Sequence, residues 1–138
     1  MQTKESYFEA VRKKSSAEGF KEQKKLYEFV KTYPGLKAEH GPKDDVKNLS
    51  YVIKAGPYSV GYVQDDGLIQ AYFLGYESTN TPLPEKLREE YRRKTGEILG
   101  VKSKSEKWKN IVKPGTTLPL DKLKQLLVWI AQEIVKTK

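Results

Sequence analysis

The residue types best suited to chemistry gather between positions 101 and 119, where five lysines surround one tryptophan. Glu106 is the only acidic residue of this segment. The set consists of Lys102, Lys104, Lys107, Trp108, Lys109 and Lys113. Ammonium groups pair with phosphates and an indole ring stacks on an unpaired base, so the segment predicts contact with a nucleic acid. The same residues also fit a solvated edge strand, in which lysines prevent pairing with another chain.

The charge distribution has the same two interpretations. The 138 residues carry a formal net charge of +8, and residues 101–138, with nine basic and three acidic side chains, supply +6 of it. Such an excess favours anionic partners through long-range attraction, and it is equally typical of a lysine-rich, solubilising surface. If four or five of the lysines each contact a phosphate, binding weakens with salt with a log–log slope of roughly −3 to −4.

Residues suited to catalysis or metal binding are sparse. Cysteine is absent, which excludes disulfides and thiolate chemistry. The single histidine, His40, stands near Asp44 and Asp45. One histidine with two adjacent carboxylates is a poor ligand set, and turn formation explains the aspartates as well. The sequence has no phosphate loop, nucleophile elbow or zinc-ligand spacing, so we expect a non-catalytic protein without metal or cofactor.

Three β-rich runs between Leu49 and Leu74, separated by glycine turns, predict an antiparallel meander with a hairpin at Asp66-Gly67. A two-residue loop pairs Val63 with Gln70. It places on one face Val60, Tyr62, Ile69, Ala71 and Phe73. A three-residue loop starting at Asp65 instead places Tyr58, Val60 and Tyr62 with Leu68, Tyr72 and Leu74. We prefer the first register because its face is more apolar and because Tyr72 then covers Gly61.

Four amphipathic helices are predicted around this meander. Thr3 caps the first, a Ser15–Glu18 capping box starts the second, and the second ends near Thr32. The third extends from Pro84 to Gly100, and the fourth from Leu120 to Lys136.

The last helix has an apolar surface broader than one stripe, because Val128 and Trp129 widen it. A helix that is apolar on most sides is buried between layers or forms an interface. An alternative function is therefore a protein–protein interaction module or a homodimer that uses Val128 and Trp129. The tyrosines of the meander also have two interpretations: they stack on bases, or they half-bury as strong strand formers.

Together these elements predict one α+β domain over residues 1–138. An antiparallel β-meander of three to four strands is packed by the N-terminal helices and by the long apolar C-terminal helix, with Trp108–Lys113 the candidate fourth strand. No apolar run is long enough for a membrane span or a signal peptide, so we expect a cytoplasmic protein with no membrane partner.

A basic α+β chain of this kind invites comparison with restriction-type nucleases. Their magnesium site needs carboxylates and a lysine on neighbouring strands, and the strand Leu68–Phe73 has neither. The chain nonetheless resembles small uncharacterised α+β domains found beside restriction or nuclease modules in bacteria and archaea. The matching features are Tyr7-Phe8-Glu9, the helix to Tyr33, the Asp66-Gly67 strand pair, the Leu87–Gly100 helix and the closing Leu126–Ile130 segment. This resemblance implies a nucleic-acid-linked role, and our leading hypothesis is a non-catalytic domain that binds nucleic acid through its basic C-terminal segment.

Overall fold

The structure is a computed structural model that describes residues 1–76 and 80–136. Its helices are α1 (Lys4–Lys14), α2 (Ala17–Thr32), α3 (Glu85–Leu99) and α4 (Leu120–Lys136). Its strands are β1 (Leu36–His40), β2 (Ser50–Ala55), β3 (Tyr58–Gln64), β4 (Ile69–Tyr72) and β5 (Trp108–Val112). The α+β prediction is confirmed. The candidate fourth strand joins the sheet as β5, but the count of three to four is wrong because the short polar segment Leu36–His40 adds a fifth strand at the other edge.

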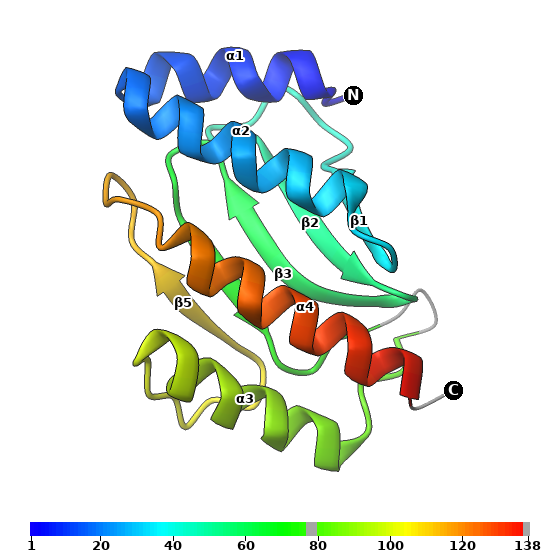
Figure 1. Cartoon of the computed structure of the whole chain (residues 1–138). Coiled ribbons are helices and arrows are strands. Elements are labelled where there is room, and N and C mark those ends of the chain that lie inside the picture. The colour runs from blue at the N-terminus through cyan, green and yellow to red at the C-terminus, as the bar shows by residue number, and fades with distance from the viewer. Residues whose placement is uncertain (77–79, 137–138) are drawn as a thin grey trace.

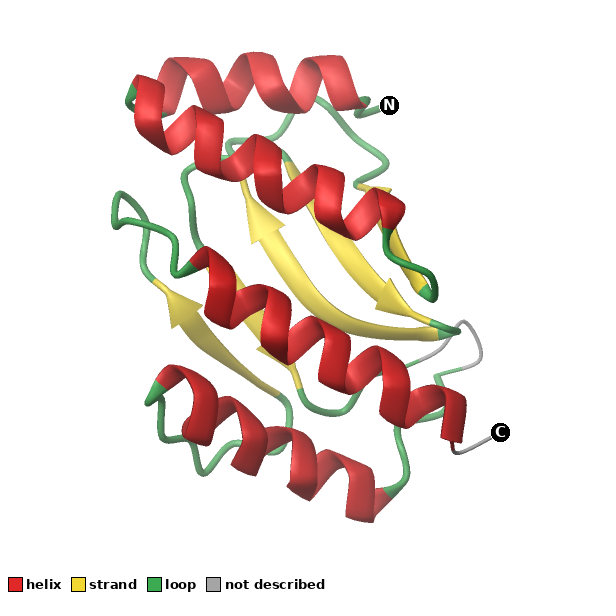
Figure 2. Ribbon diagram, in the orientation of Figure 1, coloured by secondary structure: helices red, strands yellow, loops and turns green. Residues whose placement is uncertain are grey.

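The sheet is antiparallel throughout, with its strands in the order β1-β2-β3-β4-β5. Figure 1 shows α2 and α4 crossing the same face of the sheet, with α1 beyond α2 and α3 beyond α4. The same layering is visible when the chain is coloured by secondary structure (Figure 2). In the described part of the chain, no helix lies on the opposite face, which we call the open face.

The helix ends follow capping rules. The Thr3 side chain accepts from the Ser6 amide in a capping box at the start of α1. The predicted Ser15–Glu18 box is replaced by Ser16, whose backbone is extended and whose side chain accepts from the Gly19 amide. Gly100 ends α3 in the left-handed conformation, which a glycine adopts without strain.

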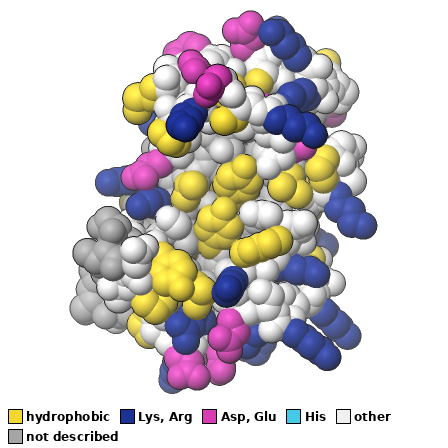
Figure 3. Space-filling model, turned by 180° about the vertical axis from the view of Figure 1, so that it is seen from behind, with side chains coloured by type: hydrophobic (Ala, Val, Ile, Leu, Met, Phe, Trp, Pro, Cys, Tyr) yellow, Lys and Arg dark blue, Asp and Glu magenta, His cyan; other side chains and the backbone are white. Residues whose placement is uncertain are grey.

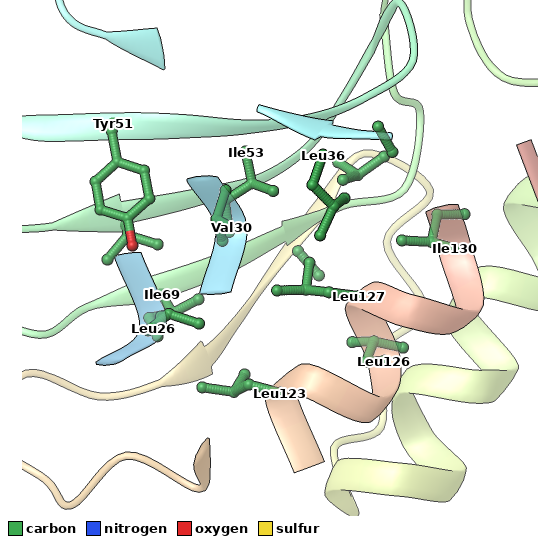
Figure 4. Close-up of a cluster of buried hydrophobic side chains, with 14 of the residues drawn as sticks. Leu26, Val30, Leu36, Tyr51, Ile53, Ile69, Leu123, Leu126, Leu127 and Ile130 are labelled. Carbon is green, nitrogen blue, oxygen red and sulfur yellow. The ribbon is translucent and has the colours of Figure 1, made fainter. Parts of the chain in front are cut away.

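The hydrophobic core fills the space between the helices and the sheet (Figure 4). Leu26 and Val30 of α2 and Leu127 of α4 project towards the sheet, where Tyr51, Ile53 and Ile69 are buried. The α4 side chains in the core are Leu123, Leu126, Leu127, Ile130, Ala131 and Ile134. One face of α4 therefore packs against the sheet.

The β3–β4 hairpin has the register that we did not prefer. Gly61 pairs with Ala71 and Val63 with Ile69, so the loop has three residues. Tyr62 consequently leaves the buried face, and Gly61 is covered by Ala71 instead of Tyr72. The physical reason is Asp65: its carboxylate turns inward, is fully buried, and accepts from the Leu49 amide at 2.7 Å. Because its side chain is held by the Leu49 amide, Asp65 lies in the loop and not in β3. Gly67, at φ +96°, completes the three-residue turn.

Candidate nucleic-acid interface on the open face

Strand alternation assigns the polar and aromatic residues of the sheet to the open face. In β2, the buried Tyr51, Ile53 and Ala55 alternate with the half-buried Ser50, Val52 and Lys54. The residues that follow this alternation on the other strands are Tyr62 and Gln64, Gln70 and Tyr72, and Trp108 and Asn110. Figure 3 views this face and shows hydrophobic side chains over its middle, with Lys and Arg side chains mainly around the margin.

Three rings on this face come from three neighbouring strands, and we call them the aromatic platform: Tyr62, Tyr72 and Trp108. The Tyr62 and Tyr72 rings are stacked, with centroids 6.2 Å apart and planes 19° apart. Tyr72 lies directly opposite Trp108 in the β4–β5 ladder, so these side chains leave the sheet on the same side. Trp108 is 47% exposed, an unusual exposure for so large an apolar ring.

A hollow of about 390 Å³ adjoins the platform. Its lining is Ser59, Tyr72, Leu74, Gly75, Tyr76, Lys107 and Trp108. Tyr76 is also 47% exposed, so two of the most exposed aromatic rings in the described chain border one hollow. Gly75, in the lining, has φ +57°, and a Cβ at this position would lie 2.6 Å from the Leu83 side chain, so the backbone here requires a glycine.

The phenol of Tyr72 is uncharged near neutral pH. Partial burial, reinforced by the neighbouring Tyr62 phenol, raises the pKa of Tyr72 above its ordinary value of 10.0. The Tyr62 hydroxyl donates to Gln64 Oε1 at 3.0 Å. The neutral Tyr72 ring therefore brings no negative charge towards a phosphate backbone.

The sequence-predicted lysines do not form one group. Lys107 lines the hollow beside Trp108. Lys109 lies opposite the buried Ala71, which places its side chain on the helix-covered side of the sheet. Lys113 follows the end of β5, in the loop where Thr116 donates to its carbonyl oxygen.

Lys102 and Lys104 lie together in a second depression, of about 530 Å³, against the outer side of α3. Arg92 and Arg93 of α3 line the same depression. Arg92 donates to the Lys104 carbonyl at 3.4 Å, while Arg93 pairs with Glu97 at 2.9 Å. Glu89 also lines this depression, and the loop that carries Lys102 and Lys104 leads directly into β5.

Sequence reasoning missed Tyr62, Tyr72 and Tyr76 as partners of Trp108. The signal was present in the alternation of Tyr62, Gln70 and Tyr72, but it depends on the correct hairpin register. With the two-residue loop, Tyr62 and Tyr72 fall on opposite faces.

The residues of the alternative interface lie on α4. Trp129 is half-buried and stacks on Tyr91 of α3, with centroids 6.3 Å apart. Val128 is half-buried, while Val135 in the last turn is 65% exposed. Part of the broad apolar surface of α4 is therefore used inside the chain, between α2 and α3.

His40 belongs to an aromatic cluster and lies apart from the two aspartates. Its Nε2 lies 2.9 Å from the Tyr27 hydroxyl, and its ring contacts those of Tyr7 and Tyr51. Asp44 lies near the N-terminal amino group instead, at 3.6 Å. Burial lowers the pKa of His40 below 6.5, which favours the neutral imidazole.

Among residues 1–76 and 80–136, no three His, Asp or Glu side chains are grouped in a way that suits a metal ion. Within the same ranges, the helices are too short or too polar to cross a membrane. No protein-family model, curated protein or solved structure matches this chain.

Proposed function

We propose that this protein is a non-catalytic domain that binds single-stranded nucleic acid on the open face of its sheet. The observation that carries the proposal is the aromatic platform: Tyr62, Tyr72 and the exposed Trp108 stand side by side on a sheet face that no described helix covers. Aromatic side chains on an open antiparallel sheet are a recurrent means of stacking unpaired bases. The resemblance to domains beside nuclease modules stays a prediction that agrees with this role.

Stacking explains why the ligand is single-stranded. The platform offers ring faces, and the bases of a duplex already use their own faces for stacking on one another. Each base stacked on an aromatic side chain contributes about 1–3 kcal/mol to the binding free energy, and this contribution depends little on which base is stacked. The hollow beside Tyr72 and Trp108 has room for one further base, since ligand sites begin at about 300 Å³.

The charges around the platform complement a phosphate backbone. Lys107 borders the hollow, and Lys102 and Lys104 line the depression against α3 together with Arg92. Lys109 and Lys113 lie elsewhere, so fewer lysines contact phosphate than the sequence suggested. Three phosphate contacts on a single strand give a log–log salt slope of about −2.

The test is a salt titration of binding to single-stranded and double-stranded DNA and RNA, by fluorescence anisotropy. Trp108→Ala should weaken single-strand binding about 5- to 150-fold, the equivalent of 1–3 kcal/mol. The Lys107→Glu variant should also weaken single-strand binding, and the loss of affinity should be larger at low salt than at high salt.

The two tryptophans provide a matched control. In Trp129→Phe, the remaining Trp108 should be quenched by the nucleic acid, whereas in Trp108→Phe the remaining Trp129 should not respond. Absence of binding at low salt, or equal binding by wild type and Trp108→Ala, refutes the proposal.

A homodimer or other protein contact through α4 is the second candidate function. It is supported by the exposed Val135, which extends the apolar surface of the half-buried Val128 and Trp129. Light scattering at rising concentration tests it: a dimer that Val135→Lys converts to a monomer supports this function. A monomer at every concentration contradicts the homodimer.

A further inference from the structure

We infer that Gln70 and Asn110 select the base that stacks beside them, and that they favour adenine. The inference rests on the proposed function, because it concerns the same open face. Gln70 on β4 lies directly opposite Asn110 on β5, and their side chains form a hydrogen bond from Gln70 Nε2 to Asn110 Oδ1 at 2.8 Å.

Gln70 and Asn110 lie in the row next to that of Tyr72 and Trp108, and Tyr62 belongs to the amide row because it opposes Gln70. Tyr72 opposes Trp108 in one row, and Gln70 opposes Asn110 in the next. Two residues along a strand separate the rows, a distance of about 7 Å. A base stacked on the row of Tyr72 and Trp108 therefore presents an edge to the amide row.

The mutual hydrogen bond uses only part of what the two carboxamides offer. Each side chain has an acceptor oxygen and two donor hydrogens. Within the described residues, Gln70 Oε1 and Asn110 Nδ2 make no further hydrogen bond to the protein. One acceptor oxygen, Gln70 Oε1, and three donor hydrogens, two of them on Asn110 Nδ2, therefore remain free on this pair.

Two features of the sheet restrict the orientation of this pair. The hydrogen bond between Gln70 and Asn110 restricts both amides, and Tyr62 lies opposite Gln70 on its other side. A β-bulge follows at Ile111, since Val112 returns to pair with Ile69. Bulges re-aim side chains and are common beside binding sites. Restricted amides select between base edges, whereas freely rotating amides adapt to any of them.

Adenine is the base that this chemistry fits best. Its amino group donates and its adjacent ring nitrogen accepts, which is the combination that Asn and Gln side chains recognise. Cytosine has a similar pair on a smaller ring that stacks over less area. Thymine and uracil present a ring N–H between two carbonyls, and they lack the amino group through which Asn and Gln side chains recognise adenine.

The experiment compares the oligonucleotides dA15, dC15 and dT15 by anisotropy, with wild type, Gln70→Ala, Asn110→Ala and Trp108→Ala. Wild type should bind dA15 at least about 5-fold more tightly than dT15, the lower limit for one well-placed amide contact. Either amide variant should reduce that ratio to about 2 or less, while it retains dT15 binding. Circular dichroism confirms that each variant is folded.

The outcomes separate this inference from the proposed function. Equal binding of all three oligonucleotides by wild type, with a loss in Trp108→Ala, leaves the platform intact and overturns base selection. A dA15 preference that survives both amide variants also overturns it. Failure of every oligonucleotide to bind overturns the proposed function together with the inference.

Discussion

The turn that sets the register of the platform depends on a buried carboxylate, and removing its partner tests that dependence. Asp65 Oδ2 accepts from Lys14 Nζ at 2.8 Å and from the Leu49 amide at 2.7 Å. The Asp65 side chain is 1% exposed, whereas Lys14 is 33% exposed. Loss of Lys14 therefore leaves a buried charge without its partner, whereas loss of Asp65 leaves a charge that water can reach.

Lys14→Met should cost more than Asp65→Ala. Without the lysine, the buried carboxylate keeps only one amide donor, and breaking a buried pair in this way costs about 3–5 kcal/mol. Without Asp65, the buried Leu49 amide is unpaired, at about 1–3 kcal/mol. Lys14 then loses little, because its ammonium still donates to the Lys47 carbonyl and to Asn48 Oδ1 and reaches water.

Urea unfolding at pH 7, followed by circular dichroism, measures both variants. The control is Lys13→Met, which removes an exposed ion pair to Glu9 at 3.5 Å and should change the unfolding free energy by less than about 0.5 kcal/mol. The double variant should cost less than the sum of the two single variants, because Lys14 and Asp65 act as a pair. If Lys14→Met is no less stable than Lys13→Met, the ion pair does not anchor the turn.

Three further predictions concern Tyr91, His40 and Gly75. Tyr91→Phe removes a buried hydrogen bond to the Val60 carbonyl, 2.6 Å long, and should lower the unfolding free energy by about 1–2 kcal/mol in urea. Burial lowers the pKa of His40 in the folded state, so stability present above pH 6.5 should decline as the pH falls below that value; His40→Gln should flatten this part of a thermal-unfolding pH series. Gly75→Ala requires a side chain at φ +57° within 2.6 Å of a leucine, and should lower the melting temperature and weaken oligonucleotide binding at the hollow.

The helices were predictable because their signals are local. Thr3 and Ser6, three residues apart, form the cap of α1, and Gly100 ends α3 at the residue where the apolar pattern stops. The buried face of α4 was predictable because the spacing of apolar residues within the helix determines it. The Ser15–Glu18 box failed by one residue, since neighbouring serines are equivalent caps until the backbone angle of each is fixed.

The hairpin register was not predictable from local sequence. It depends on Asp65 reaching Lys14, 51 residues away in the chain. An aspartate beside Asp-Gly is an ordinary turn residue, and nothing in its neighbourhood signals burial. A one-residue change of register exchanges the faces of a strand, so this single distant contact decides where Tyr62 lies.

The candidate site also combines a feature that local sequence predicts with one that depends on long-range contacts. Trp108 was identified from its lysine neighbours, and it is the most exposed ring of the platform. Its lysines were grouped by sequence proximity, yet alternation along β5 separates Lys109 from Trp108, and the preceding loop carries Lys102 to the α3 side. Proximity in sequence therefore found the segment, and the three-dimensional pairing of the strands decided which of its members share a surface.

One face of the sheet packs against the helices and stabilises the fold, while the other carries the proposed binding site. Substitutions on the open face can therefore test binding without unfolding the protein. Tyr51, Ile53 and Ile69 pack against α2 and α4, and truncating such side chains costs about 2–5 kcal/mol. Trp108 retains nearly half of its exposed surface and lies on an edge strand, so replacing it removes far less buried area. A variant at Trp108 that stays folded and loses binding therefore reports on the open face itself. A variant in the core that loses binding reports only on the register that places the platform.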